Sequence, residues 1–204
     1  MPNTTRYQRA KRVTIIGALV NTLLGVSKLF GGLWFHSSAL VADGFHSLSD
    51  LLTDAMVLVA SKYGSQEADE SHPYGHQRIE TATTYILALL LIIAWDAIRH
   101  LTQHQLEHPG LLTLPIAFVS IIANEALFWY TRHVGRAIQS DLVIANAWHH
   151  RSDAASSLIV FAGLLGSFAG YPALDGIAAF VVGLLIIKMG FDYGWRSIKE
   201  LIDT

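Results

Sequence analysis

The sequence predicts an all-α, polytopic membrane protein with six transmembrane helices and cytoplasmic N- and C-termini. Apolar residues make up 52% of the chain and charged residues only 15%, whereas charged residues make up roughly 25% of soluble domains. Six apolar stretches approach or exceed the roughly 20 residues that a spanning helix needs. Residues 1–204 therefore form one transmembrane domain, with helices predicted at 13–35, 39–60, 78–99, 111–133, 142–168 and 173–190.

Basic residues define the first helix and the orientation of the bundle. Cations precede the stretch 13–35, as in a signal peptide, but this stretch is too long for one and lacks a small-residue cleavage motif. We interpret it as a retained anchor. Most Lys and Arg residues fall on the side of the N-terminus and Arg99 lies alone on the other, which predicts that both termini are cytoplasmic. The clustered cations are Arg6, Arg9, Lys11, Arg12, Lys62, Arg78, Arg132, Arg136, Lys188, Arg196 and Lys199.

Two cations lie well inside predicted helices, away from their ends: Lys28 in 13–35 and Arg151 in 142–168. An unpaired charge in hydrocarbon costs several kcal/mol, so we expect each cation to have a carboxylate partner within the bundle. Asp43 is one candidate, and it either pairs with Lys28 or Arg151 or lines a path for an ion. Glu125 fits either a buried ion pair or a proton relay.

Helices 39–60 and 142–168 contain the same arrangement, a histidine four residues before an aspartate. The pairs are His46 with Asp50 and His149 with Asp153. On a helix this spacing puts imidazole and carboxylate on one face, one turn apart. Both pairs are expected roughly 10 to 16 Å deep in a core of about 30 Å, so they can meet near the midplane. Single polar groups often only bridge helices by hydrogen bonds, but two matched pairs favour a metal site.

The donor set of this site contains nitrogen and oxygen only, because the chain has no cysteine. Two imidazoles and two carboxylates suit tetrahedral zinc, and cobalt(II) or iron(II) can also bind. Copper(I) prefers sulfur, and magnesium or calcium prefers more oxygen ligands.

Other classes of protein fit the sequence less well. The lack of a His-Glu-x-x-His motif argues against an intramembrane metalloenzyme, so we expect no enzyme. A passive channel should bind its ion weakly, whereas a closed four-ligand site favours alternating access. The net charge of -2 indicates no nucleic-acid partner.

Three segments resemble the signatures of the cation diffusion facilitator family: residues 39–50, residues 68–76, and His149-x-x-x-Asp153. The resemblance implies a proton-coupled exporter of divalent transition metals that works as a homodimer. It assigns His46, Asp50, His149 and Asp153 to the transport site, with zinc as the transported ion and no prosthetic group. It also implies an integral membrane protein, here of the bacterial inner membrane. An iron(II) or cobalt(II) exporter, or a metal-sensing membrane protein, is the alternative.

The loop after the second helix matches a further metal site of the family through Asp69, His72 and His76. These residues can capture metal before transport, but a solvated loop rich in Asp and His is also simply polar. Most family members continue into a cytoplasmic domain after the last helix. The sequence ends near the point where that domain would begin, so we expect the domain to be absent here, either because this member lacks it or because the chain is truncated.

The transport site also predicts proton exchange. With zinc bound, two carboxylates and two neutral imidazoles give no net charge, whereas the empty site would hold two negative charges in a medium of low dielectric constant. Because metal ligands must be deprotonated, we expect the empty carrier to take up protons.

Overall fold

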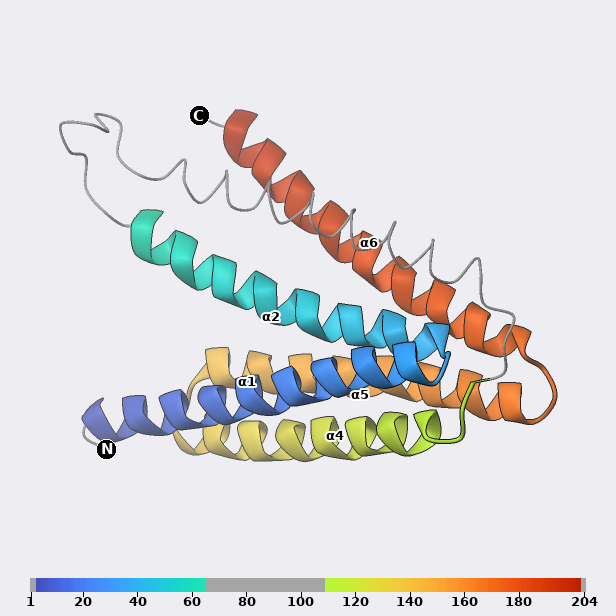
Figure 1. The fold of residues 1–204 in the computed structure, drawn as a ribbon. Helices are drawn as coiled ribbons and strands as arrows, with labels where there is room; N and C mark the ends of the chain where they lie inside the picture. Colours follow the sequence, from blue (N-terminus) through green and yellow to red (C-terminus); the bar gives the residue numbers. More distant parts are fainter. Residues whose placement is uncertain (1–2, 65–108, 203–204) are drawn as a thin grey trace.

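The computed structural model describes residues 3–64 and 109–202, and every regular element in that part of the chain is a helix (Figure 1). The predicted all-α class is therefore confirmed. The predicted helix 78–99 and the loop with Asp69, His72 and His76 lie outside the described residues. The helices are α1 (Asn3–Trp34), α2 (Ser38–Gly64), α4 (Thr113–Ala137), α5 (Asp141–Phe168) and α6 (Ala173–Ile202).

The observed helices match the predicted ones but extend further at their polar ends. Helix α1 begins at Asn3 rather than at residue 13, and α6 ends at Ile202 rather than at residue 190. Apolarity marks only the part of a helix that crosses hydrocarbon, whereas the backbone hydrogen bonds continue into the polar flanks. For this reason the hydropathy pattern underestimates helix length.

Three of the described helices are long and apolar enough to cross a membrane, over Arg6–Trp34, Thr113–Ala137 and Ala173–Asp192. Helices α2 and α5 are not among them, because their ionisable and hydroxyl side chains lower their mean hydropathy. These two helices carry the four predicted metal ligands. The helices that carry the predicted ligands are thus outside the three candidate spans.

The helices run between two ends of the bundle (Figure 1). At the end that we call the closed end, α1 and α5 finish and α2, α4 and α6 begin; at the opposite, open end lie both ends of the described chain. The main apolar core joins α2, α4, α5 and α6 toward the closed end. Its buried residues are Ala39, Leu40, Ala42, Ala117, Val160, Leu164, Ala178, Ala179, Val182 and Ile186.

Helices α1 and α2 approach each other closely at two glycines. A Cβ atom on Gly32 would lie 2.6 Å from the backbone nitrogen of Val41, and one on Gly44 would lie 2.6 Å from that of Leu29. Real Cβ atoms do not come so near, so only glycine permits this packing. The close approach brings the side chain of Lys28 against α2.

Asp175, in the first turn of α6, caps the N-terminus of α2. Its carboxylate accepts hydrogen bonds from Ser37 Oγ at 2.7 Å and from the backbone nitrogens of Ser38 at 2.7 Å and Ala39 at 3.3 Å. Ser37 Oγ in turn accepts from the backbone nitrogen of Leu40 at 3.1 Å. A carboxylate at the positive end of a helix dipole satisfies amides that have no partner within the helix. This contact fixes where α2 starts relative to α6.

We expect Asp175→Ala to lower the free energy of unfolding by about 2 kcal/mol, because it leaves buried donors unsatisfied. The matched control is Asp141→Ala, which removes an exposed acidic residue from the first turn of α5. It should cost no more than about 0.5 kcal/mol. Thermal unfolding of both variants in detergent measures the difference, and equal stabilities would contradict the capping role.

Candidate metal centre

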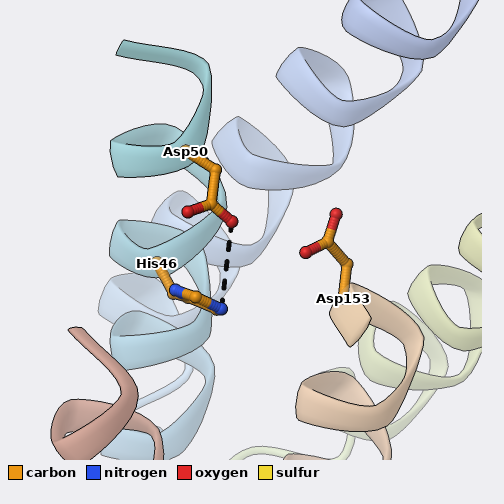
Figure 2. A group of neighbouring side chains, drawn as sticks. All are labelled: His46, Asp50 and Asp153. Carbon is orange, nitrogen blue, oxygen red and sulfur yellow. Dashed lines mark ion pairs between the residues drawn. The ribbon is translucent and has the colours of Figure 1, made fainter. Parts of the chain in front are cut away.

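The four predicted ligands come together between α2 and α5. His46 Nε2 lies 3.9 Å from Asp50 Oδ2 within α2, and His149 Nε2 lies 3.8 Å from Asp153 Oδ2 within α5. The two helices are joined across the site by His149 Nε2 and Asp50 Oδ2, which are 3.7 Å apart. Figure 2 shows His46 and Asp50 on one face of α2, directed toward Asp153 of α5.

These separations are close to those of a tetrahedral metal site. Ligand atoms of His46, Asp50 and Asp153 all lie within 4.8 Å of one another. Around zinc, with ligands at about 2.0 to 2.1 Å, neighbouring donor atoms are about 3.3 Å apart. To reach zinc geometry, the three pairs at 3.7 to 3.9 Å would have to close by about half an ångström. The widest pair among His46, Asp50 and Asp153 would have to close by up to about 1.5 Å, and side-chain torsions can supply such shifts.

Burial makes the centre asymmetric. The side chains of His46, Asp50 and Asp153 are 11%, 6% and 5% exposed, whereas that of His149 is 37% exposed. Within the described part of the chain, His46 Nδ1 and Asp153 Oδ1 have no hydrogen-bond partner. Buried polar atoms are rarely left unpaired. The carboxylate of Asp153 therefore keeps one oxygen that a bound ion could use.

Asn21 contacts the centre from α1, and no motif in the sequence marks this residue. Its Nδ2 donates to Asp153 Oδ2 at 3.4 Å and lies 3.4 Å from Nδ1 of the buried His150. The imidazole of His150 packs where Gly17 lacks a side chain. His150 therefore faces α1 while His149 faces the ligands, and a lone asparagine in the apolar run of α1 was the available signal.

A cavity of about 320 Å³ gives access to the ligands. All four ligands and Ser152 line it on one side, and α6 lines the other. No sequence motif marked α6 as part of the site. Its contribution consists of Leu185, Lys188, Met189 and Asp192.

Lys28 and Arg151 both have carboxylate partners, as expected. Lys28 Nζ is 2.9 Å from Asp43 Oδ2, with both side chains fully buried. Arg151 Nε is 4.0 Å from Glu125 Oε2, and its guanidinium lies 4.6 Å from the centre of the Phe128 ring. Of the alternatives for Asp43, the structure shows the ion pair with Lys28.

Comparisons with known proteins agree with this arrangement. The profile of the cation efflux transmembrane domain matches residues 14–202. The chain is 35% identical over 95% of its length to an uncharacterized transporter of Methanocaldococcus jannaschii, covering 70% of that protein. It is 34% identical over 97% of its length to metal tolerance protein C1 of Arabidopsis thaliana and 33% identical over 94% to mitochondrial metal transporter 2 of Saccharomyces cerevisiae.

The match is extensive on this chain but partial on the relatives. The chain spans 46% of the plant protein and 46% of the yeast protein. The profile, by contrast, covers α1 from residue 14, all of α2, α4 and α5, and α6 to its end at Ile202. The helical fold, the two histidine–aspartate pairs and the sequence similarity thus lead to one assignment: the chain belongs to the cation diffusion facilitator family of membrane metal transporters.

Proposed function

We propose that this chain is a secondary active exporter that moves zinc out of the cytoplasm in exchange for protons. The observation that carries the proposal is the convergence of His46, Asp50, His149 and Asp153 on one buried point beside a cavity. Nitrogen and oxygen ligands at near-tetrahedral spacing suit zinc. Their position between membrane helices suits transport, because ionisable groups there commonly bind the transported ion.

The proposed topology has six crossings with both termini in the cytoplasm. It is supported by the start of α1 and the end of α6 lying at the same, open end of the bundle (Figure 1). Helix α2 finishes at the open end and α4 begins at the closed end. The described cations at the open end include Arg6, Arg12, Arg132 and Arg136, as the positive-inside rule requires of a cytoplasmic face.

The same proposal sets the cellular context and partners. Export against protons needs an energised membrane, which in a bacterium is the inner membrane. We also propose a homodimer, in keeping with the family resemblance, and capture of metal by Asp69, His72 and His76 before it reaches the cavity. No prosthetic group is needed, because the metal is the transported substrate.

Zinc flux into proteoliposomes tests the function. With a fluorescent zinc indicator inside and a pH gradient across the membrane, we expect zinc uptake that stops when the gradient is collapsed. Zinc flux that does not depend on the pH gradient would indicate a channel. Zinc binding without zinc flux would indicate a sensor. Measuring the flux of cobalt(II) and iron(II) in the same assay shows which of the three ions is transported fastest.

We expect His46→Asp to admit cadmium. A carboxylate can hold a larger ion with both oxygens, whereas an imidazole offers one fixed nitrogen. The cadmium-to-zinc flux ratio should rise several-fold. The control is His150→Asn, which changes the imidazole next to His149 that faces α1, and it should not raise the ratio. An unchanged ratio in His46→Asp would contradict the proposed role of His46 in selectivity.

A further inference from the structure

A second buried polar cluster lies next to the metal centre. Lys28 Nζ of α1 is paired with Asp43 of α2 at 2.9 Å and donates a hydrogen bond to Ser47 Oγ at 3.1 Å. From α5, Ser156 Oγ donates to Asp43 Oδ1 and Ser157 Oγ donates to Asp43 Oδ2, both at 2.9 Å. We call these five residues the polar cluster. It joins three helices at one carboxylate.

The polar cluster differs from the metal centre in being satisfied by its own members. Both oxygens of Asp43 accept hydrogen bonds, and the ammonium of Lys28 has an anionic partner. In the metal centre, His46 Nδ1 and Asp153 Oδ1 have no such partner among the described residues. The polar cluster is therefore a closed network, whereas the metal centre is open to a ligand.

Asp43, Ser156 and Ser157 of the polar cluster lie on the closed-end side of the metal centre, and Ser47 lies at its level. Asp43 precedes His46 by one helical turn, and Ser156 follows Asp153 by one turn on the antiparallel helix α5. Both displacements point toward the closed end (Figure 1). The cavity is lined by the four ligands and by α6, but by none of the five cluster residues. The ligands thus have the cavity on one side and Asp43, Ser156 and Ser157 on the other.

An ion that leaves the metal centre toward the closed end along α2 and α5 has to pass the polar cluster. The helices are sealed there, because Asp43 and Ser157 are fully buried, as are Leu40 and Leu164 beyond them. The ammonium of Lys28 repels a divalent cation and occupies the carboxylate that would otherwise attract it. In the conformation described, the polar cluster blocks this route.

We propose that Lys28, Asp43, Ser47, Ser156 and Ser157 form the closed-end gate of the transport path, which opens when the ion is released there. This inference rests on the proposed transport function. A buried ion pair contributes little net stability compared with apolar residues of the same volume, so stability alone does not account for it. Once separated and hydrated, the cluster offers a passing cation carboxylate and hydroxyl oxygens that an apolar seal lacks.

Single cysteines can test the gate, because the chain has none of its own. Ser157→Cys places a thiol in the polar cluster and leaves the Lys28–Asp43 pair intact. Ser152→Cys is the matched control, since Ser152 lies on the same helix but lines the cavity. A membrane-impermeant methanethiosulfonate is applied to one face of oriented membrane vesicles at a time. Labelling and zinc flux are measured in the same vesicles, with and without a pH gradient.

At rest, we expect Ser152→Cys to be labelled from the open-end face and Ser157→Cys to react at least about tenfold more slowly from either face, because labelling of a buried group requires opening. During zinc transport, Ser157→Cys should become reactive from the closed-end face only. Equal reactivity of the two cysteines at rest would overturn the gate. Continued protection of Ser157→Cys during normal zinc flux would also overturn it.

A second variant covers the case in which Ser157→Cys stops transport by itself. Ser156→Cys then reports on the same carboxylate, and the gate requires it to be protected at rest and labelled from the closed-end face during flux. Protection of Ser156→Cys during flux overturns the proposal. If the wild-type chain moves no zinc, the proposed function fails, whereas the resting contrast between Ser152→Cys and Ser157→Cys separately reports whether the closed end is sealed.

Discussion

Asp50→Asn and Asp153→Asn should each abolish zinc transport while the protein stays folded. An amide has nearly the shape of the carboxylate but no charge, so it is a weak zinc ligand and leaves a net positive charge on the occupied site. Loss of a residue that only hydrogen-bonds to a metal ligand typically lowers metal affinity about 10- to 100-fold. Loss of a ligand itself should therefore lower zinc affinity at least about 100-fold. His46→Ala and His149→Ala remove the other two ligands and should also abolish transport.

Zinc flux, zinc binding by calorimetry and thermal unfolding should be measured on the same preparations. Asp141→Asn is the matched control, because it makes the same chemical change on α5 at an exposed position outside the cavity. It should transport and bind zinc normally. Normal flux in two or more of the four ligand variants would show that the site is assigned wrongly.

The four candidate ligands could be picked out from sequence because their signal is local. A spacing of four residues places His46 near Asp50 and His149 near Asp153 on any helix, and apolar flanks identify both helices. Their meeting across the bundle followed from topology and depth. The structure agrees, with 3.7 Å between His149 Nε2 and Asp50 Oδ2.

Contacts that depend on tertiary packing were not predictable in the same way. Nothing in the local sequence connects Asn21 with Asp153, or Asp175 with the start of α2, because each pair is joined only when distant helices pack. The partner of Asp43 also stayed open until the structure showed Lys28. The close packing at Gly32 and Gly44 brings α1 against α2 and thereby makes Lys28 the partner of Asp43. Contacts between distant helices depend on how the helix surfaces fit together, and the spacing of residues along the sequence does not contain this information.

The direction of transport should depend on an opposing flow of protons. In the proposed zinc site, the charge of the ion would balance those of Asp50 and Asp153, and the imidazoles of His46 and His149 would be neutral because metal ligands must be deprotonated. After release, two negative charges would remain at side chains that are only 6% and 5% exposed. Such a state is costly in a medium of low dielectric constant, so the empty carrier should return with protons bound, on the histidines or the aspartates.

Zinc and protons should therefore compete for the same atoms, and zinc affinity should fall as pH falls. Sealed vesicles with a pH indicator inside should report proton movement opposite to zinc movement, and an imposed pH gradient should drive zinc uphill. Asp153→Asn vesicles are the control for passive leak, because that variant should bind no zinc and show no zinc-dependent change in pH. Antiport would be contradicted if zinc moves without an opposing proton flux and at a rate that the pH gradient does not alter. This result would not contradict the assignment of the metal site. In that case the two carboxylates would have to be neutralised by another cation during the return step, and replacing sodium or potassium in the buffer would identify it.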